Sequence, residues 1–452
     1  MQDATALAHA VARGETTARA ALEASLAAAE RHAGLGTIAR LDADAAFLRA
    51  EALDSAPSRA HGPFHGVPFL GKDLGSHARG LAPAAGSPAL RRRLRSPATD
   101  SDLFAGFRRA GLNPFGLSTV PEFGLSLSIE PPEAPPARNP WNPDLTPGGS
   151  SGGAAAAVAA GIVAIAHATD AAGSIRVPAA CCGLVGLKPS RGATPGGPDF
   201  GNHLMGLVSE LVLARTTRDV AAAFALAADA PPARRPAAGP PRLALAVPDR
   251  CGPAEAAASR AAAEAIARDG CEVIERPAPD DLGLEAARLA RLILSVSLAD
   301  WLDAVGVPDP EVSRLAAAVV QEGRALPGSA VFAASRDLAR LGHRAAGLCE
   351  GCDAILMPVL SGSPPRVGTF DPGSSTPHRR FAAMEDFAPN AALANAAGLP
   401  ALALPFGTAG ALPMSVQILG PVGSDATLLE LGARLERLGP TPTFPHPVAG
   451  LA

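Results

Sequence analysis

Thr146-Pro-Gly-Gly-Ser-Ser-Gly-Gly153 is a loop of small residues with two adjacent serines. An Ala-rich helical stretch and an apolar run follow it, and a second loop, Thr169-Asp-Ala-Ala-Gly-Ser-Ile-Arg176, comes next. A helix and a strand between the loops return the chain toward its start, so Ser150 and Ser174 can face each other. The two loops therefore predict a site that contains both serines.

Short apolar runs alternate with Gly-, Pro- and Ser-rich loops on both sides of this site. These runs predict strands over residues 67–70, 113–117, 162–168, 184–187, 242–247, 354–359, 401–405 and 414–419, and the last helix over 425–438. Short strands separated by helices favour an α/β fold, with a mixed central β-sheet covered by helices on both faces.

One stretch of the chain differs from the rest in its pattern. Residues 242–350 are mostly Ala/Leu/Arg-rich helical patterns such as 284–302, and an Ala-, Pro- and Arg-rich boundary at 230–241 precedes them. We therefore expect a single domain over 1–452, with a core of about 60–228 and 350–440 and a variable helical lobe of about 242–350.

Composition excludes several classes of partner. The 452-residue chain has a formal net charge of −4 and no basic run beyond 91–95, which argues against nucleic acid. Its most apolar stretch, 154–168, is too short to cross a bilayer. The first 13 residues lack the features of a signal peptide, so we expect a cytoplasmic protein with no membrane partner.

The six cysteines predict reduced thiols rather than a disulfide framework. Cys349 and Cys352 have CxxC spacing, but no second Cys/His pair with ligand spacing accompanies them, so no metal site is expected. The lysines are more informative, because only Lys72 and Lys188 of the 39 Lys and Arg residues are lysines. Arginine stays protonated, whereas a buried lysine can act as a base, so these two positions are candidates for chemistry.

Five stretches of sequence together resemble the amidase signature family. They are the lysine motif Gly66-Val-Pro-Phe-Leu-Gly-Lys-Asp73, the two serine loops with their continuation through Pro189, and the closing segments Asn395-Ala-Ala-Gly-Leu-Pro400 and Leu412-Pro-Met-Ser-Val-Gln417. The resemblance spans roughly residues 10–440 and implies the amidase signature fold. It also implies a hydrolase that cuts a linear or cyclic carboxamide C–N bond, nearest to bacterial hydrolases of small or cyclic amides.

The resemblance assigns Ser174 as the nucleophile, Ser150 as a bridging serine preceded by a cis peptide bond, and Lys72 as the base. A serine hydroxyl is a poor nucleophile until a base takes its proton, and burial lowers a lysine pKa enough for that task. The backbone N–H groups of Ala171, Ala172 and Gly173 are expected to form the oxyanion hole.

Other residues of these loops are expected to support the site. Ser151, Asp170 and Arg176 are predicted to brace it or to contact substrate, and Lys188 to be a structural hydrogen-bond donor. The family usually has Gly at the position of Ala172. If that position needs a positive φ or a close approach of the substrate, the methyl group of Ala172 would impair the site.

Three alternatives stay open at this point. A catalytically impaired homologue is one, and an accessory amidotransferase-like subunit is another, although Val177 replaces the Gln usual in that group. The third is a Ser-His-Asp esterase with Ser150 in a G-x-S-x-G elbow and His378 or His446 as base, but no strand directly precedes that loop.

The remaining expectations concern ligands. The resemblance implies a small-molecule amide substrate, no cofactor and no metal, and a homodimer. Residues near 120–130, 200–207 and 250–350 are expected to line the substrate pocket.

Overall fold

A mixed sheet of eleven strands runs through the computed structural model, which describes residues 2–57, 61–198, 203–228, 239–371, 373–440 and 442–451. The strands are β1 (Ile38–Leu41), β2 (Pro68–Lys72), β3 (Asn113–Ser118), β4 (Ile165–Asp170), β5 (Val185–Lys188), β6 (Ser209–Ala214), β7 (Arg242–Leu245), β8 (Glu272–Glu275), β9 (Ala354–Pro358), β10 (Ala401–Ala409) and β11 (Leu412–Leu419). Their order is β1-β3-β2-β4-β6-β5-β10-β11-β9-β7-β8.

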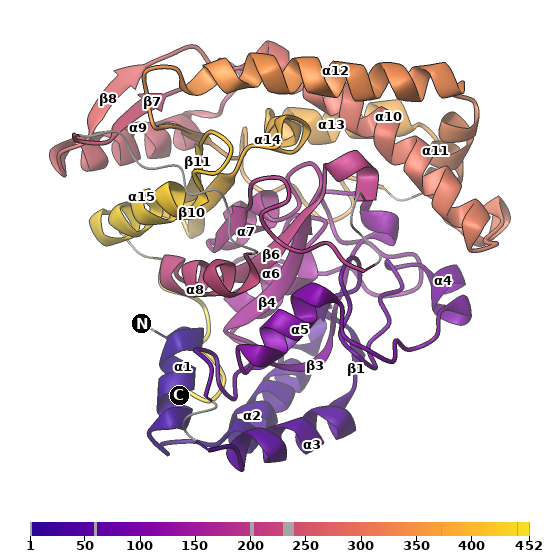
Figure 1. Ribbon diagram of the computed structural model, residues 1–452, viewed down its shortest axis with the longest axis vertical. Coiled ribbons are helices and arrows are strands. Elements are labelled where there is room, and N and C mark those ends of the chain that lie inside the picture. Colours follow the sequence, from indigo (N-terminus) through magenta and orange to yellow (C-terminus); the bar gives the residue numbers. More distant parts are fainter. Residues whose placement is uncertain are drawn as a thin grey trace.

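Helices cover both faces of this sheet (Figure 1). The α-helices are α1 (Ala4–Ala12), α2 (Ala18–Arg31), α3 (Ala43–Asp54), α4 (Pro88–Arg93), α5 (Asp102–Arg109), α6 (Gly152–Ala159), α7 (Arg176–Cys182), α8 (Thr217–Ala227), α9 (Pro253–Arg268), α10 (Asp280–Ala304), α11 (Arg314–Arg324), α12 (Gly328–Ala346), α13 (Pro377–Phe387), α14 (Ala391–Ala397) and α15 (Asp425–Leu438). No helix in the described ranges is both long and apolar enough to span a bilayer. The expected α/β fold with a mixed, helix-covered sheet is confirmed.

The pairing of β2 with β4 places the end of the lysine motif beside the start of the second serine loop. The strands are parallel, with Leu70 opposite Ala166, so Lys72 and Asp170 both lie at carboxyl ends. Helix α6 begins at Gly152, directly after the two serines of the first loop, and α7 begins at Arg176, the last residue of the second loop. Strand β4 begins three residues later than predicted, because the Ile162 N–H still closes the end of α6 by donating to the Ala157 carbonyl oxygen at 2.9 Å.

Residues 242–350 contribute to the sheet as well as to its helical cover. Strands β7 and β8 extend the sheet in parallel beyond β9. Helices α10, α11 and α12 then lie together at one end of the molecule, opposite α1–α3 (Figure 1). Most of the predicted boundary, 230–238, lies outside the described residues, and the division into core and lobe stays a prediction.

The contact between α10 and α11 gives a test of this packing. A Cβ added at Gly323 of α11 would lie 2.1 Å from the carbonyl oxygen of Ser295 in α10, whereas Gly342 of α12 has its nearest neighbour at 3.9 Å. We expect Gly323→Ala to lower the free energy of unfolding by about 1–3 kcal/mol. The matched control Gly342→Ala should raise it by about 0.5–1 kcal/mol. Urea denaturation measures both, and equal effects of the two substitutions would contradict this packing.

Candidate active site

Lys72 is the last residue of β2 and is completely buried. Its Nζ lies 2.8 Å from Oγ of Ser150 and 2.7 Å from Oγ1 of Thr169. Burial lowers the pKa of Lys72 to about 7, although the Glu210 and Asp170 carboxylates act in the opposite direction. A substantial fraction of Lys72 is therefore neutral near pH 7.

The surroundings of Nζ suit a neutral amine, which has two N–H bonds and one lone pair. Oγ1 of Thr169 and, at 3.5 Å, the Thr169 carbonyl oxygen can accept the two N–H bonds. The lone pair is then left for the hydroxyl hydrogen of Ser150. Thr169 lies within the quoted loop, but its role was missed because only the contact itself identifies it.

The loop that carries Ser150 depends on close backbone approach. The bond between Gly149 and Ser150 is cis, as predicted. A Cβ at Gly149 would lie 2.4 Å from the Ser126 carbonyl oxygen, so a larger residue there would clash with backbone. Next to it, Ser151 is buried, and its Oγ accepts from the Thr169 N–H at 3.3 Å, which ties the two serine loops together.

Ser174 lies in a tight turn whose shape Asp170 fixes. The Asp170 carboxylate accepts hydrogen bonds from the N–H groups of Gly173 at 2.6 Å and Ile175 at 3.1 Å. Gly173 has a φ of 114°, where a side chain would be strained. Ser174 itself is 8% exposed, and its hydroxyl makes no hydrogen bond among the described residues, so it is open to a ligand.

The turn changes the set of expected oxyanion donors. The Gly173 N–H points to Asp170 and is already used, contrary to our expectation for this group. The N–H groups of Ala171 and Ala172 donate to no described protein acceptor, so they stay available. Ala172 is not among the described non-glycine residues with positive φ, so the methyl group causes no backbone strain there.

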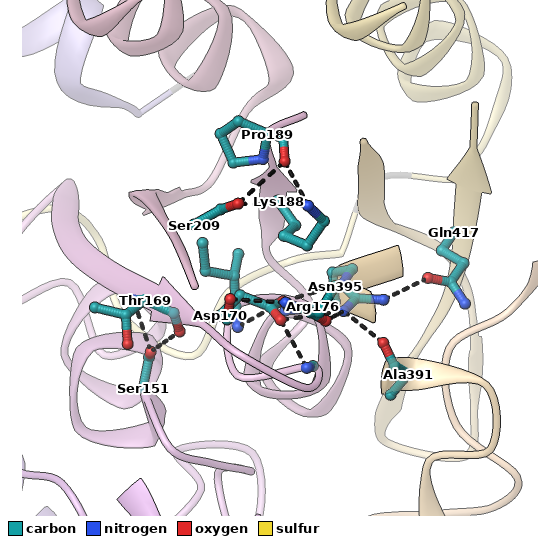
Figure 2. Close-up of polar contacts among 12 residues, drawn as sticks. Ser151, Thr169, Asp170, Arg176, Lys188, Pro189, Ser209, Ala391, Asn395 and Gln417 are labelled. Carbon is teal, nitrogen blue, oxygen red and sulfur yellow. Dashed lines mark hydrogen bonds and ion pairs between the residues drawn. The ribbon is translucent and has the colours of Figure 1, made fainter. Parts of the chain in front are cut away.

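A buried ion pair lies behind the turn (Figure 2). Arg176 contacts Asp170 at 3.0 Å, the Ala391 carbonyl oxygen at 2.7 Å and Asn395 Oδ1 at 2.8 Å. Burial alone would raise the pKa of Asp170, but the Arg176 guanidinium holds it at about 2. The network also joins Gln417 and ties the turn to β11 and α14.

The second lysine lies on the far side of this network. Lys188, the last residue of β5, donates to the Pro189 carbonyl oxygen and to Oγ of Ser209 (Figure 2). Burial lowers its pKa to about 7 as well. Lys188 lines neither cavity described below, and its contacts agree with a structural donor.

Two cavities meet at Ser174. The larger cavity encloses about 990 Å³ of empty space, including its opening to solvent, and the smaller cavity about 630 Å³. Ala171, Ser174, Gly124, Leu125, Leu204 and Leu294 line both of them. The predicted lining regions near 120–130 and 250–350 thus converge here, joined by Leu204 and Leu207, while 199–202 lie outside the described residues.

Ser150 and Ser174 both line the smaller cavity, together with Thr169 and Glu210. Glu210 and its partner His167 are further residues that sequence reasoning missed. His167 Nε2 lies 2.9 Å from Glu210, and its Nδ1 lies 3.2 Å from the backbone nitrogen of Lys72. Each sits inside an apolar strand, so the sequence offered only their polarity as a signal.

Other sequence candidates lie away from this site. His446 packs against His32, and neither His446 nor His378 lines either cavity. Cys349 and Cys352 are buried thiols outside both cavities. Within the described ranges, no group of three or more His, Cys, Asp or Glu side chains could hold a metal ion.

Comparison with known proteins places the chain in a family. A sequence model of the amidase family matches residues 20–429. A putative amidase of Synechocystis is 33% identical over 83% of this chain and 75% of its own length. The 6-aminohexanoate-cyclic-dimer hydrolase of Paenarthrobacter ureafaciens is 30% identical over 96% of this chain and 94% of its own length.

The fold agrees with that assignment. A solved structure of 6-aminohexanoate cyclic dimer hydrolase superposes with a TM-score of 0.89 and 30% identity, covering 97% of each chain. This chain therefore belongs to the amidase signature family and is an amidase that acts on carbon–nitrogen bonds other than peptide bonds.

Proposed function

We propose that the chain hydrolyses a small linear or cyclic carboxamide through an acyl-enzyme on Ser174, with Ser150 as proton relay and neutral Lys72 as base. The observation that carries the proposal is the 2.8 Å contact between the buried Nζ of Lys72 and Oγ of Ser150. A buried lysine with a lowered pKa beside a serine is the arrangement that activates a hydroxyl nucleophile.

In the first step, Ser174 attacks the carbonyl carbon of the amide. Its proton passes to Ser150 while the Ser150 proton passes to Lys72. The carbonyl oxygen takes the negative charge, and the N–H groups of Ala171 and Ala172 stabilise it. Asp170 and Arg176 hold the turn in place, while Ser151 holds Thr169 and so the Lys72 amine.

In the second step, the C–N bond breaks. The leaving nitrogen takes a proton from Ser150, which regains one from Lys72, and the amine departs. Water then attacks the ester carbon by the same proton route, and the acid is released with Ser174 restored. The cycle consumes one amide and one water and needs no group beyond these side chains.

The cavities support a substrate of modest size. The larger cavity is lined mostly by apolar residues such as Leu125, Leu284 and Phe381, as small-molecule sites usually are. A relative that covers nearly the whole chain is named for a cyclic amide, which supports including cyclic substrates. The ordinary backbone conformation of Ala172 supports an active enzyme over an impaired homologue.

A panel of aliphatic, aryl and cyclic amides tests the proposal. Wild type should hydrolyse members of the panel, and Ser174→Ala and Lys72→Ala should each lower kcat by about 10³-fold or more, because each removes part of one relay. Product release is followed by chromatography, and circular dichroism checks that both variants fold. Turnover that survives either substitution would contradict the assigned roles.

The pH dependence tests the base. Because Lys72 must be neutral to accept a proton and has a pKa of about 7, kcat/KM should rise tenfold per pH unit below about 7 and level off above it. Lys188 has a pKa in the same range, so Lys188→Gln is the matched control and should leave the midpoint unchanged. A flat profile from pH 5 to 9, or a midpoint that shifts in Lys188→Gln, would argue against Lys72 as the base.

A further inference from the structure

The smaller cavity contains one carboxylate in otherwise neutral surroundings. Glu210 is the only ionisable side chain among the residues that line it, and 5% of that side chain is exposed. The rings of Phe123 and Trp301 line the same cavity and meet edge to face, with centroids 5.8 Å apart. A carboxylate and aromatic rings in one cavity are the features that recognise an organic cation.

The hydrogen bonds of Glu210 leave its negative charge in place. Nδ1 of His167 accepts the backbone N–H of Lys72, so the imidazole proton is on Nε2, which donates to Glu210. The Ser76 N–H donates to Glu210 at 3.0 Å. Burial opposes ionisation, but these donors hold the pKa of Glu210 below its ordinary value.

Catalysis removes one nearby cation, because Lys72 interacts with the Glu210 charge when it is protonated. Lys72 acts as a base only when neutral, and the buried Glu210 carboxylate then lacks that positive charge. A buried charge in that position is costly unless an opposite charge joins it. A cation supplied by the substrate would stabilise Glu210 and also disfavour protonation of Lys72, which keeps the base in its active form.

The lining residues indicate which half of the substrate enters this cavity. Ser150 lines the smaller cavity and not the larger, whereas Ala172 lines the larger and not the smaller. The leaving nitrogen must take its proton from Ser150. The amine half of the amide therefore lies in the smaller cavity, and the acyl half extends into the larger one.

We propose that the smaller cavity binds a protonated amine on the leaving-group half of the substrate, held by Glu210 and the rings of Phe123 and Trp301. This inference rests on the proposed function and names its substrate class: amides formed between a carboxylic acid and one nitrogen of a short diamine. Hydrolysis releases the acid and the free diamine.

A pair of substrates of nearly equal shape tests it. N-(2-aminoethyl)butanamide carries an ammonium group where N-propylbutanamide carries a methyl group, and both release butanoate. We expect wild type to show a kcat/KM at least about tenfold higher for the cationic amide at pH 8. The ratio should fall to one or below in Glu210→Gln and should be kept in Glu385→Gln, whose carboxyl lines only the larger cavity.

The ratio of kcat/KM for the cationic amide to kcat/KM for the neutral amide, measured on wild type, tests the inference even if Glu210→Gln does not fold. A ratio of one or less, with Ser174-dependent hydrolysis of the neutral amide, overturns this inference and leaves the proposed function standing. A high ratio that persists in folded Glu210→Gln also overturns it. Failure of wild type on the whole amide panel would overturn both.

Discussion

The rest of the site depends on the burial of one lysine amine against one serine hydroxyl. Lys72 is held at the end of β2 with no exposure to solvent, and this desolvation, rather than a neighbouring cation, brings its pKa to about 7. The closely packed glycines around Ser150 place its hydroxyl where the Lys72 lone pair can reach it. The parallel pairing of β2 with β4 then brings Thr169 to the same amine.

Two buried carboxylates on either side of the relay have different partners, and this difference sets their roles. Asp170 is neutralised by Arg176, and the same two carboxylate oxygens accept the backbone N–H groups that shape the Ser174 turn. Glu210 accepts hydrogen bonds from His167 and the Ser76 N–H and keeps its charge at the wall of the smaller cavity. Both favour the protonated form of Lys72, so the neutral base exists only because burial outweighs them. A cation bound at Glu210 would shift that balance toward catalysis.

Much of this arrangement could be predicted from the sequence, because local signals carry it. Lysine is rare here and marks Lys72, the serine loops mark Ser150 and Ser174, and the apolar runs give eight of the eleven strands to within a few residues, with β1, β6 and β8 missed. Partners distant in sequence carried no such signal: His167 and Glu210 meet only because β4 and β6 pair. The use of the Gly173 N–H by Asp170 depends on turn geometry, which residue types alone do not determine.

The central claim is that Ser174 is the nucleophile and that Lys72 activates it through Ser150. Labelling with an alkyl fluorophosphonate, which loses fluoride to an activated serine, followed by peptide mapping, tests it most directly. The account predicts one adduct, on Ser174, formed rapidly in wild type and far more slowly in Lys72→Ala. An adduct on Ser150, or labelling of Ser174 at an undiminished rate without Lys72, would contradict it.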